Sequence, residues 1–246
     1  MDSKAINNIL YLDVGNSSIK GAYKKKTQWE PLNNKRSGTA LELIEWIDNH
    51  PQSFSEVVIS SVRMDVLKAI RQQLKNIPVS ELSLQDIPRD LLDYETIDTL
   101  GIDRFLSCYG ASAQTPNPVV VIDAGTAITV DYMDRDDTYH GGVIAPGFAG
   151  FGEVLHKKAP SLPEVDLVIP KKWPGKSTID SLRWGQAGFY KMAIEGMLDK
   201  YKAEFGDYEL FITGGNADTI QAMTKREGKV RPFLVFDGME RLYRKP

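Results

Sequence analysis

The sequence predicts an α/β protein of two lobes with duplicated topology, and three observations support this prediction. Short apolar runs typical of buried strands alternate with segments of helical period. The stretch Val119–Asp131 (VVVIDAGTAITVD) combines a strand, the carboxylate of Asp123, a tight turn and a second strand. The stretch from Ile9 to Tyr23 has the same form around Asp13, 110 residues earlier, which indicates an internal repeat.

The first half of the chain alternates between strands and helices in order. Thr39 and Glu42 have the spacing of a helix-capping box, and apolar residues follow at helical period. The run 57–59 predicts a short buried strand, and residues 64–74 predict a second helix. A further helix opens at 101–104. The break at 115–118 (TPNP) separates an expected N-terminal lobe, 1–115, from a C-terminal lobe, 116–246.

The second half continues the same alternation. After the hairpin come a short helix over 148–155, an extended loop over 159–173 and a long helix from Ser177 to about Gly206. A buried strand over 210–213, a helix capped by Asn216, a last strand over 233–236 and a short helix from Met239 complete the prediction. The expected apolar face of the long helix consists of Ile179, Leu182, Gln186, Phe189, Ala193, Met197 and Tyr201.

Composition narrows the class of protein. The chain is 42% hydrophobic and 26% charged, as expected for a globular protein, and its net charge of -3 gives no reason to expect nucleic acid or a membrane as partner. The apolar runs are too short for a membrane helix, and the N-terminus has no secretory pattern. The single cysteine, Cys108, suits a reducing cytoplasm and is expected to be buried.

Three glycine-bearing turns, at Gly15, Gly125 and 214–215, each follow a predicted buried strand. Backbone N–H groups in such turns can bind the oxygens of a phosphate. Carboxylates beside a phosphate repel it unless a cation intervenes, so Asp13 and Asp123 indicate a bound metal. The alternative is that each aspartate only caps a structural turn. A Gly-Lys-Ser sequence at 175–177 lacks the leading glycine of a P-loop, because position 170 is proline.

The motifs resemble those of type III pantothenate kinases. They are DVGNSS at 13–18, GIDR at 101–104, DAGTAITVD at 123–131, GGVIAPG at 141–147 and TGG at 213–215. The resemblance covers nearly the whole chain. It implies two ribonuclease-H-like lobes of the acetate and sugar kinase, actin-like superfamily, with the active site in the cleft between them. It further implies ATP-dependent phosphorylation of pantothenate at the start of coenzyme A synthesis.

The resemblance also assigns roles to individual residues. Asp103 would be the general base, and Asp123 would bind a monovalent cation, K⁺ or NH₄⁺, in addition to the Mg²⁺ that accompanies ATP. The protein would be a homodimer in which the partner closes the substrate pocket. The implied ATP contacts are Asp13, Val14, Gly15, Asn16, Ser17, Ser18, Ile19, Lys20 and Thr126. The implied pantothenate contacts are Tyr94, Gly101, Ile102, Asp103, Arg104 and Thr178.

Several positions depart from the family pattern. Ser17 stands where threonine is usual, Ser177 where asparagine is usual, and Trp184 in a run that is usually small and polar. The loop 158–163 keeps only its Ser-Leu-Pro ending. Two other functions therefore compete with the pantothenate kinase: a non-catalytic nucleotide-binding regulator on the same fold, and another small-molecule kinase or phosphatase of the superfamily. A protein that only binds nucleotide has no need to keep Asp103.

Overall fold

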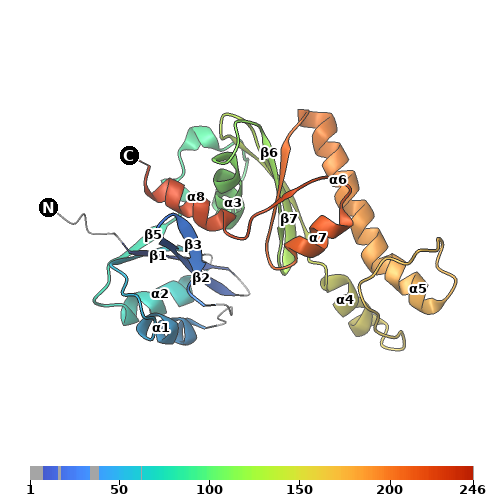
Figure 1. Ribbon diagram of the computed structural model, residues 1–246, viewed down its shortest axis with the longest axis horizontal. Coiled ribbons are helices and arrows are strands. Elements are labelled where there is room, and N and C mark those ends of the chain that lie inside the picture. Colours follow the sequence, from blue (N-terminus) through green and yellow to red (C-terminus); the bar gives the residue numbers. More distant parts are fainter. Residues whose placement is uncertain (1–7, 16–17, 34–38, 62, 246) are drawn as a thin grey trace. The chain divides into compact units, whose positions relative to one another are not determined.

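The computed structural model describes residues 8–15, 18–33, 39–61 and 63–245 (Figure 1). The chain divides into two compact units, one formed by Met1–Gly110 with Phe233–Pro246 and the other by Ala111–Pro232. This division differs from the one expected at residue 115, because the C-terminal segment packs with the first unit and not with the second.

The first unit contains a five-stranded sheet in the order β3-β2-β1-β4-β5. Strand β1 pairs antiparallel with β2 and parallel with β4. Three 3₁₀ turns, 84–86, 89–91 and 97–99, lead into helix α3. The elements are β1 (Ile9–Val14), β2 (Ile19–Lys25), β3 (Gln28–Pro31), α1 (Ala40–Asp48), β4 (Glu56–Ser61), α2 (Met64–Gln73), β5 (Val79–Leu82), α3 (Ile102–Ser112) and α8 (Leu234–Tyr243).

The second unit contains a second five-stranded sheet, in the order β10-β9-β6-β7-β8. Strand β6 pairs antiparallel with β7 and parallel with β9, just as β1 pairs with β2 and β4. The duplicated topology predicted from the repeated motif is therefore confirmed. The elements are β6 (Val119–Ala124), β7 (Ala127–Met133), β8 (Tyr139–Pro146), α4 (Gly150–Lys158), α5 (Thr178–Arg183), α6 (Phe189–Phe205), β9 (Glu209–Thr213), α7 (Ala217–Met223) and β10 (Lys229–Val230).

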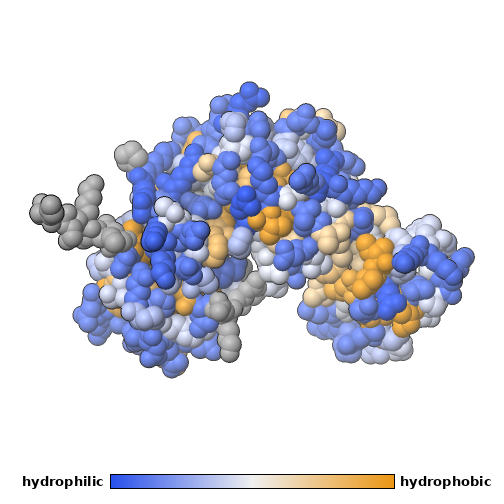
Figure 2. Space-filling view, viewed as in Figure 1, coloured by the Kyte–Doolittle hydropathy of each residue, from blue (hydrophilic) through white to orange (hydrophobic). Residues whose placement is uncertain are grey.

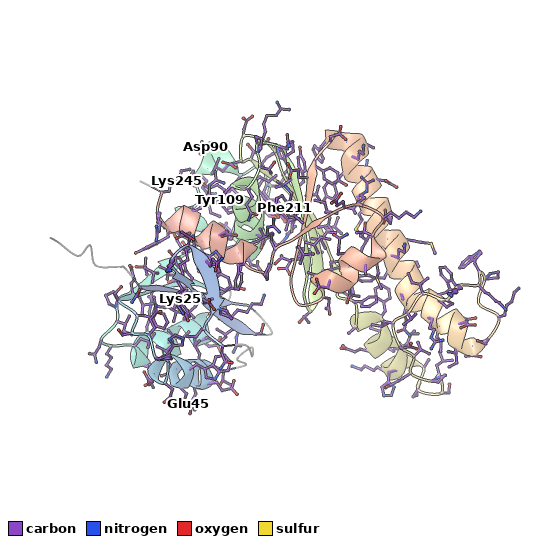
Figure 3. The ribbon with its side chains drawn as sticks, viewed as in Figure 1. Lys25, Glu45, Asp90, Tyr109, Phe211 and Lys245 are labelled. Atoms are coloured by element: carbon purple, nitrogen blue, oxygen red, sulfur yellow. The ribbon has the colours of Figure 1, made fainter. Side chains whose placement is uncertain are left out.

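Apolar side chains on the sheets and their covering helices form the core of each unit. In the first unit, α1 and α2 bury Leu43 and Leu67 against β1 and β4. The helix cap predicted at Thr39 is present, since its hydroxyl accepts a hydrogen bond from the backbone N–H of Glu42 at 3.3 Å. In the second unit, Phe211 on β9 is fully buried and is labelled in Figure 3. Within the described ranges, every helix falls short of what a membrane span requires.

Helix α8, near the C-terminus, packs against α3 in the first unit. A Cβ atom at Gly238 would lie only 1.9 Å from the Leu106 carbonyl oxygen, so α8 and α3 touch through their backbones. The Arg241 guanidinium lies 3.8 Å from the Tyr109 ring centroid and donates to the Tyr109 carbonyl oxygen at 2.9 Å. Tyr109 is labelled in Figure 3. The strand expected over 233–236 is wrong, because a short apolar run has no period that separates a strand from a buried helix.

The long helix of the second unit contains a π-helical turn, Trp184–Gly188, between α5 and α6. A π turn inserts a residue and shifts the side chains that follow it around the helix axis. The buried residues after it are Tyr190, Ile194 and Leu198. The expected face is therefore wrong by one position beyond Gln186, and Phe189 is 58% exposed.

Glu209 at the start of β9 forms hydrogen bonds with the linker before β6 and with strand β10. Its carboxylate accepts hydrogen bonds from the Thr115 hydroxyl, from Asn117 Nδ2 at 2.9 Å and from the Lys229 ammonium group. The hydrogen bond from Lys229 contributes most to lowering the pKa of Glu209 from 4.5 to about 2. The linker 115–117 and strand β10 are thus both attached to β9 through one ionised carboxylate.

We predict that Glu209→Gln lowers the free energy of unfolding at pH 7 by about 1–2 kcal/mol, a value reduced from the full pKa shift because the side chain is partly solvated. The folded-state pKa is depressed, so this stabilisation is present above pH 4.5 and disappears as the pH falls towards 2. Urea unfolding between pH 3 and 7 should show a smaller pH dependence in the variant. Glu204→Gln, at an exposed pair with Lys200, is the control and should match the parent.

Candidate active site

Asp13 is the acidic residue of the first unit's hairpin. It is only 8% exposed and lies opposite Lys20 in the β1–β2 register, with 3.8 Å between Lys20 Nζ and Asp13 Oδ2. The parallel neighbour of Asp13 is Ser60 on β4, which is also buried. Burial of a carboxylate requires a charged or hydrogen-bonding partner, and Lys20 supplies one at the edge of the turn.

The turn after Asp13 is the first predicted phosphate-binding element. The Gly15 N–H donates to the Ser18 carbonyl oxygen at 3.1 Å, which closes the turn between β1 and β2. Val14 and Ile19 are buried at its base. Of the other expected ATP contacts in this turn, Asn16 and Ser17 lie outside the described residues.

The Gly-Ile-Asp-Arg motif forms the start of α3. The Arg104 N–H donates to the Gly101 carbonyl oxygen at 3.1 Å and to Asp103 Oδ1 at 3.0 Å. A Cβ atom at Gly101 would lie 2.6 Å from Asp103 Oδ1, so glycine leaves the room that this carboxylate occupies. Arg104 is 7% exposed and Ile102 is buried, whereas Asp103 is half-buried. An accessible carboxylate and a buried arginine therefore meet in a single helical turn.

Tyr94 lies in the irregular segment before this motif. It is half-buried and falls between the 3₁₀ turns 89–91 and 97–99. Tyr94 precedes Gly101 by seven residues and belongs to no helix or strand. Its role as a pantothenate contact stays a prediction.

Asp123 is the acidic residue of the second unit's hairpin. It lies on β6 between Thr129 on β7 and Thr213 on β9, and its side chain is half-buried. Gly214 has a φ of +88°, and a Cβ atom there would lie 2.4 Å from Asp123 Oδ1. The Asn216 N–H donates to the Ala124 carbonyl oxygen at 3.1 Å, which fixes the glycine turn against the end of β6. Only glycine permits both this backbone conformation and this approach to the carboxylate.

Thr126 occupies the tip of the β6–β7 turn and is exposed. Its carbonyl oxygen accepts a hydrogen bond from the Gly147 N–H at 2.9 Å. A Cβ atom at Gly147 would lie 2.4 Å from the Gly125 carbonyl oxygen, so the end of β8 packs directly on this turn. Three glycine-containing segments thus meet around Asp123 and Thr126 within the second unit.

Thr178 is the first residue of α5 and is exposed. Ser177 caps this helix, since its hydroxyl accepts a hydrogen bond from the Asp180 N–H at 3.1 Å. Arg183, at the end of α5, donates from Nε to Asp166 Oδ1 at 2.9 Å, and this bond lowers the pKa of Asp166. Helix α5 is therefore anchored to the preceding loop, with Thr178 at its solvent-facing end.

The structure brings some predicted site residues together. Asp13 faces Lys20, the residues 101–104 share one turn, and Asp123 lies against the turn that begins at Gly214. That Asp13, Asp103 and Asp123 act in one cleft stays a prediction. The sequence reading missed a role for Gly147, although its position after Pro146 in a glycine-rich stretch was a usable signal.

The two sheets have the same strand order and pairing, and each unit has an acidic glycine turn, which defines a duplicated α/β fold. A solved structure of a 2-dehydro-3-deoxygalactonokinase protein from Sinorhizobium meliloti has the same fold, with a TM-score of 0.58 at 13% identity over 96% of this chain and 98% of that one. A protein from Campylobacter jejuni described as a Baf family transcriptional activator superposes with a TM-score of 0.63 at 25% identity, over 95% and 96% of the two chains.

Sequence comparison identifies the family within this class. The family model for type III pantothenate kinase matches residues 9–200. The type III pantothenate kinase of Flavobacterium johnsoniae is 32% identical over 219 residues, which is 88% of this chain and 89% of that protein. The enzyme of the same name from Listeria monocytogenes is 29% identical over 96% and 97% of the two chains. The chain belongs to the type III pantothenate kinase family, and the resemblance expected from its motifs is confirmed.

We predict that Gly214→Ala destabilises the second unit by about 2–4 kcal/mol, because alanine adds both positive-φ strain and a clash with the Asp123 carboxylate. Gly206→Ala is the matched control, since Gly206 has a φ of +84° but open space around its Cβ position. Its cost should be about 1–3 kcal/mol, from backbone strain alone, and lower than that of Gly214→Ala. Urea unfolding measures both, and equal costs would contradict the close approach of Gly214 to Asp123.

Proposed function

We propose that this chain transfers the γ-phosphoryl group of ATP to the primary hydroxyl of pantothenate and forms 4′-phosphopantothenate. The observation that carries the proposal is the family match over residues 9–200, which includes both acidic turns and the Gly-Ile-Asp-Arg motif. As a kinase of this family the chain uses ATP with Mg²⁺. We expect it to act in the cytoplasm, at the first step of coenzyme A synthesis.

We propose Asp103 as the general base. A primary alcohol does not ionise at neutral pH, and phosphoryl transfer proceeds through a loose transition state. A carboxylate that accepts the proton late in the transfer is therefore sufficient. Asp103 is half-buried and held at the start of α3, so it can meet a substrate and keep its orientation.

Arg104 is proposed to bind the pantothenate carboxylate. A guanidinium group can pair with a carboxylate through two parallel hydrogen bonds, which orients the ligand as well as holding it. Arg104 is buried, and its backbone is fixed by Gly101 and Asp103, which limits its freedom before substrate arrives. Tyr94 and Thr178 are proposed to complete the pantothenate contacts.

The turns after Asp13 and Asp123 are proposed to hold the triphosphate. Residues 13–20, which include the cation of Lys20, would contact the phosphates from the first unit, and Thr126 from the second. Backbone N–H groups and a lysine can neutralise charge that spreads over the phosphate oxygens in the transition state. In this mechanism the protein orients the two substrates and neutralises charge, and it forms no covalent bond with them.

Asp123 is proposed to bind K⁺ or NH₄⁺. The donor set fits such an ion, because the Asp123 carboxylate lies beside the turns at Gly125 and Gly214 and hard cations take oxygen ligands. The ion would offset the repulsion between Asp123 and the phosphates. Among the described residues no cluster of three or more His, Cys, Asp or Glu offers a polydentate metal site.

A homodimer is also proposed, as the family resemblance implies. Exposed apolar side chains on α4 and α6 support it, since Val154 and Phe189 are each 58% exposed and Met192 is 52% exposed. Figure 2 shows hydrophobic surface over this helical part of the second unit. A second copy of the chain could cover these side chains and close the pantothenate pocket.

A regulatory protein is the second candidate function. The structural neighbour described as a Baf family transcriptional activator favours it, because that chain matches 95% of this one at 25% identity. Retention of Asp103, Arg104 and both hairpin aspartates favours the kinase, since a protein that only binds nucleotide does not need a base. Another small-molecule kinase of the superfamily stays an alternative.

We predict that Asp103→Asn lowers the turnover number about 10²–10⁴-fold while ATP affinity changes little, because the amide cannot accept the alcohol proton. The test is the rate of pantothenate-dependent ADP release, with ATP affinity measured by calorimetry. Asp98→Asn, an exposed carboxylate in the turn 97–99, is the matched control and should keep the parent rate. An unchanged rate in Asp103→Asn would place the base elsewhere.

We predict that Asp123→Ala abolishes or strongly reduces the dependence of the rate on K⁺ or NH₄⁺, because the ion loses its charged ligand. The measurement is the initial rate against K⁺ concentration at constant ionic strength. Asp136→Ala, on an exposed turn, is the control and should keep the parent curve. A K⁺ dependence in Asp123→Ala equal to that of the parent would show that the cation binds elsewhere.

A further inference from the structure

The second unit contains a cavity of about 300 Å³ that the proposed reaction does not use. It lies between α4, the loop that follows α4 and the α5–π segment. Its wall is mostly aliphatic, as in many small-molecule sites. The residues that define it here are Gly152, Leu155, Leu162, Val165, Leu182 and Gln186.

Gln186 supplies a polar group in this apolar wall. The residue is only 5% exposed, and within the described part of the chain its carboxamide makes no hydrogen bond, although it is not among the fully buried unpaired groups. Water in the cavity can therefore hydrogen-bond to this carboxamide, and a ligand that displaces this water has to supply equivalent hydrogen bonds. Since Gln186 lines the cavity, a ligand seated there could satisfy it.

Gly152 leaves space in front of this carboxamide. A Cβ atom at Gly152 would lie 3.2 Å from Gln186 Oε1, closer than an ordinary contact between such atoms. The amide oxygen is therefore directed at α4 across the cavity wall. Any larger residue at 152 would reduce the room that a ligand needs to reach Gln186.

The π turn Trp184–Gly188 contains Gln186 at its centre. A π turn is less favourable than an α-helix and occurs often at functional sites, where it redirects a side chain. Here it changes which residues face the core, since Ala187 and Tyr190 are buried while Phe189 is exposed. This gives a structural reason for a polar residue to face the cavity rather than solvent.

The charges at the cavity favour an uncharged ligand. Glu153 and Glu164 both line it, and His156 Nδ1 lies 3.3 Å from Glu164 Oε1. Two carboxylates against one histidine disfavour anions, so neither ATP nor pantothenate suits this cavity. The ion pair between Arg183 and Asp166 anchors the loop that forms one wall.

We propose that this cavity is a binding site for a small, uncharged, mostly aliphatic molecule that carries one secondary amide. The Gln186 carboxamide has one donor and one acceptor side, so it can pair with both the carbonyl oxygen and the N–H of such an amide. The aliphatic body would lie against Leu155, Leu162 and Leu182. The site is distinct from the proposed phosphoryl-transfer residues, and its test does not depend on kinase activity.

N-butylacetamide is the probe, and butyl acetate is its isostere without the N–H. Methyl NMR of leucine- and valine-labelled protein reports the site directly, because five labelled side chains line it: Leu155, Leu162, Val165, Leu167 and Leu182. We expect N-butylacetamide to shift these methyl signals in a saturable way and to bind at least about tenfold more tightly than butyl acetate, because only the amide satisfies both sides of Gln186.

Two variants test the role of the carboxamide. Gln186→Leu should bring the affinity for N-butylacetamide down to that for butyl acetate, and Gly152→Ala should weaken both probes. Gly196→Ala is the matched control, since a Cβ atom at this α6 glycine meets nothing within 4 Å. Unfolding curves confirm that each variant is folded.

Three outcomes would overturn the proposal. The first is equal affinity of the parent protein for the amide and the ester. The second is that Gln186→Leu and Gly152→Ala both bind N-butylacetamide as tightly as the parent protein does. The third is a set of cavity methyl signals that shift with protein concentration and not with probe, which would mean that a side chain of a second copy occupies the cavity.

Discussion

The fold of each unit depends on a buried strand that carries an aspartate at its end and is followed directly by a turn that contains glycine. In the second unit the approach of Gly214 to Asp123 fixes the geometry, since a Cβ atom would lie 2.4 Å from the carboxylate oxygen. The same element also sets the sheet order, because the hairpin strand pairs on one side and the parallel strand β9 pairs on the other. The Asp123 carboxylate is thus held at the end of β6 against the turn that begins at Gly214.

The family is known from the comparisons, and the contacts of the motif residues are known from the structure. The comparisons establish membership of the type III pantothenate kinase family, and the structure adds how the residues of each motif are held. The Arg104 N–H bonds to the Gly101 carbonyl oxygen and to the Asp103 carboxylate, so both residues of the proposed site are held at a helix start. The glycines of the motifs are explained by contact with carboxylates and carbonyl groups rather than by flexibility.

Much of the fold could be predicted because strand period and the repeated acidic turn are local signals. The duplicated sheet and the caps at Thr39 and Ser177 were of this kind. The last helix was predicted only from Met239, and its first turn was predicted as a strand, because a four-residue apolar run fits both a strand and a buried helix. The buried face of the long helix was displaced because a π turn leaves no periodic signal. Roles for Gly147 and Gln186 depend on tertiary contacts that sequence period does not encode.

We propose that the two acidic turns and Asp103 together support a cation-dependent phosphoryl transfer to an alcohol. Product formation by purified protein with ATP, Mg²⁺ and pantothenate, followed by mass spectrometry in K⁺, NH₄⁺ and Na⁺ buffers, tests this directly. We expect one 4′-phosphopantothenate for each ADP released, with a much higher rate in K⁺ or NH₄⁺ than in Na⁺. No phosphorylated product in any of these buffers, from protein that binds ATP, would contradict it.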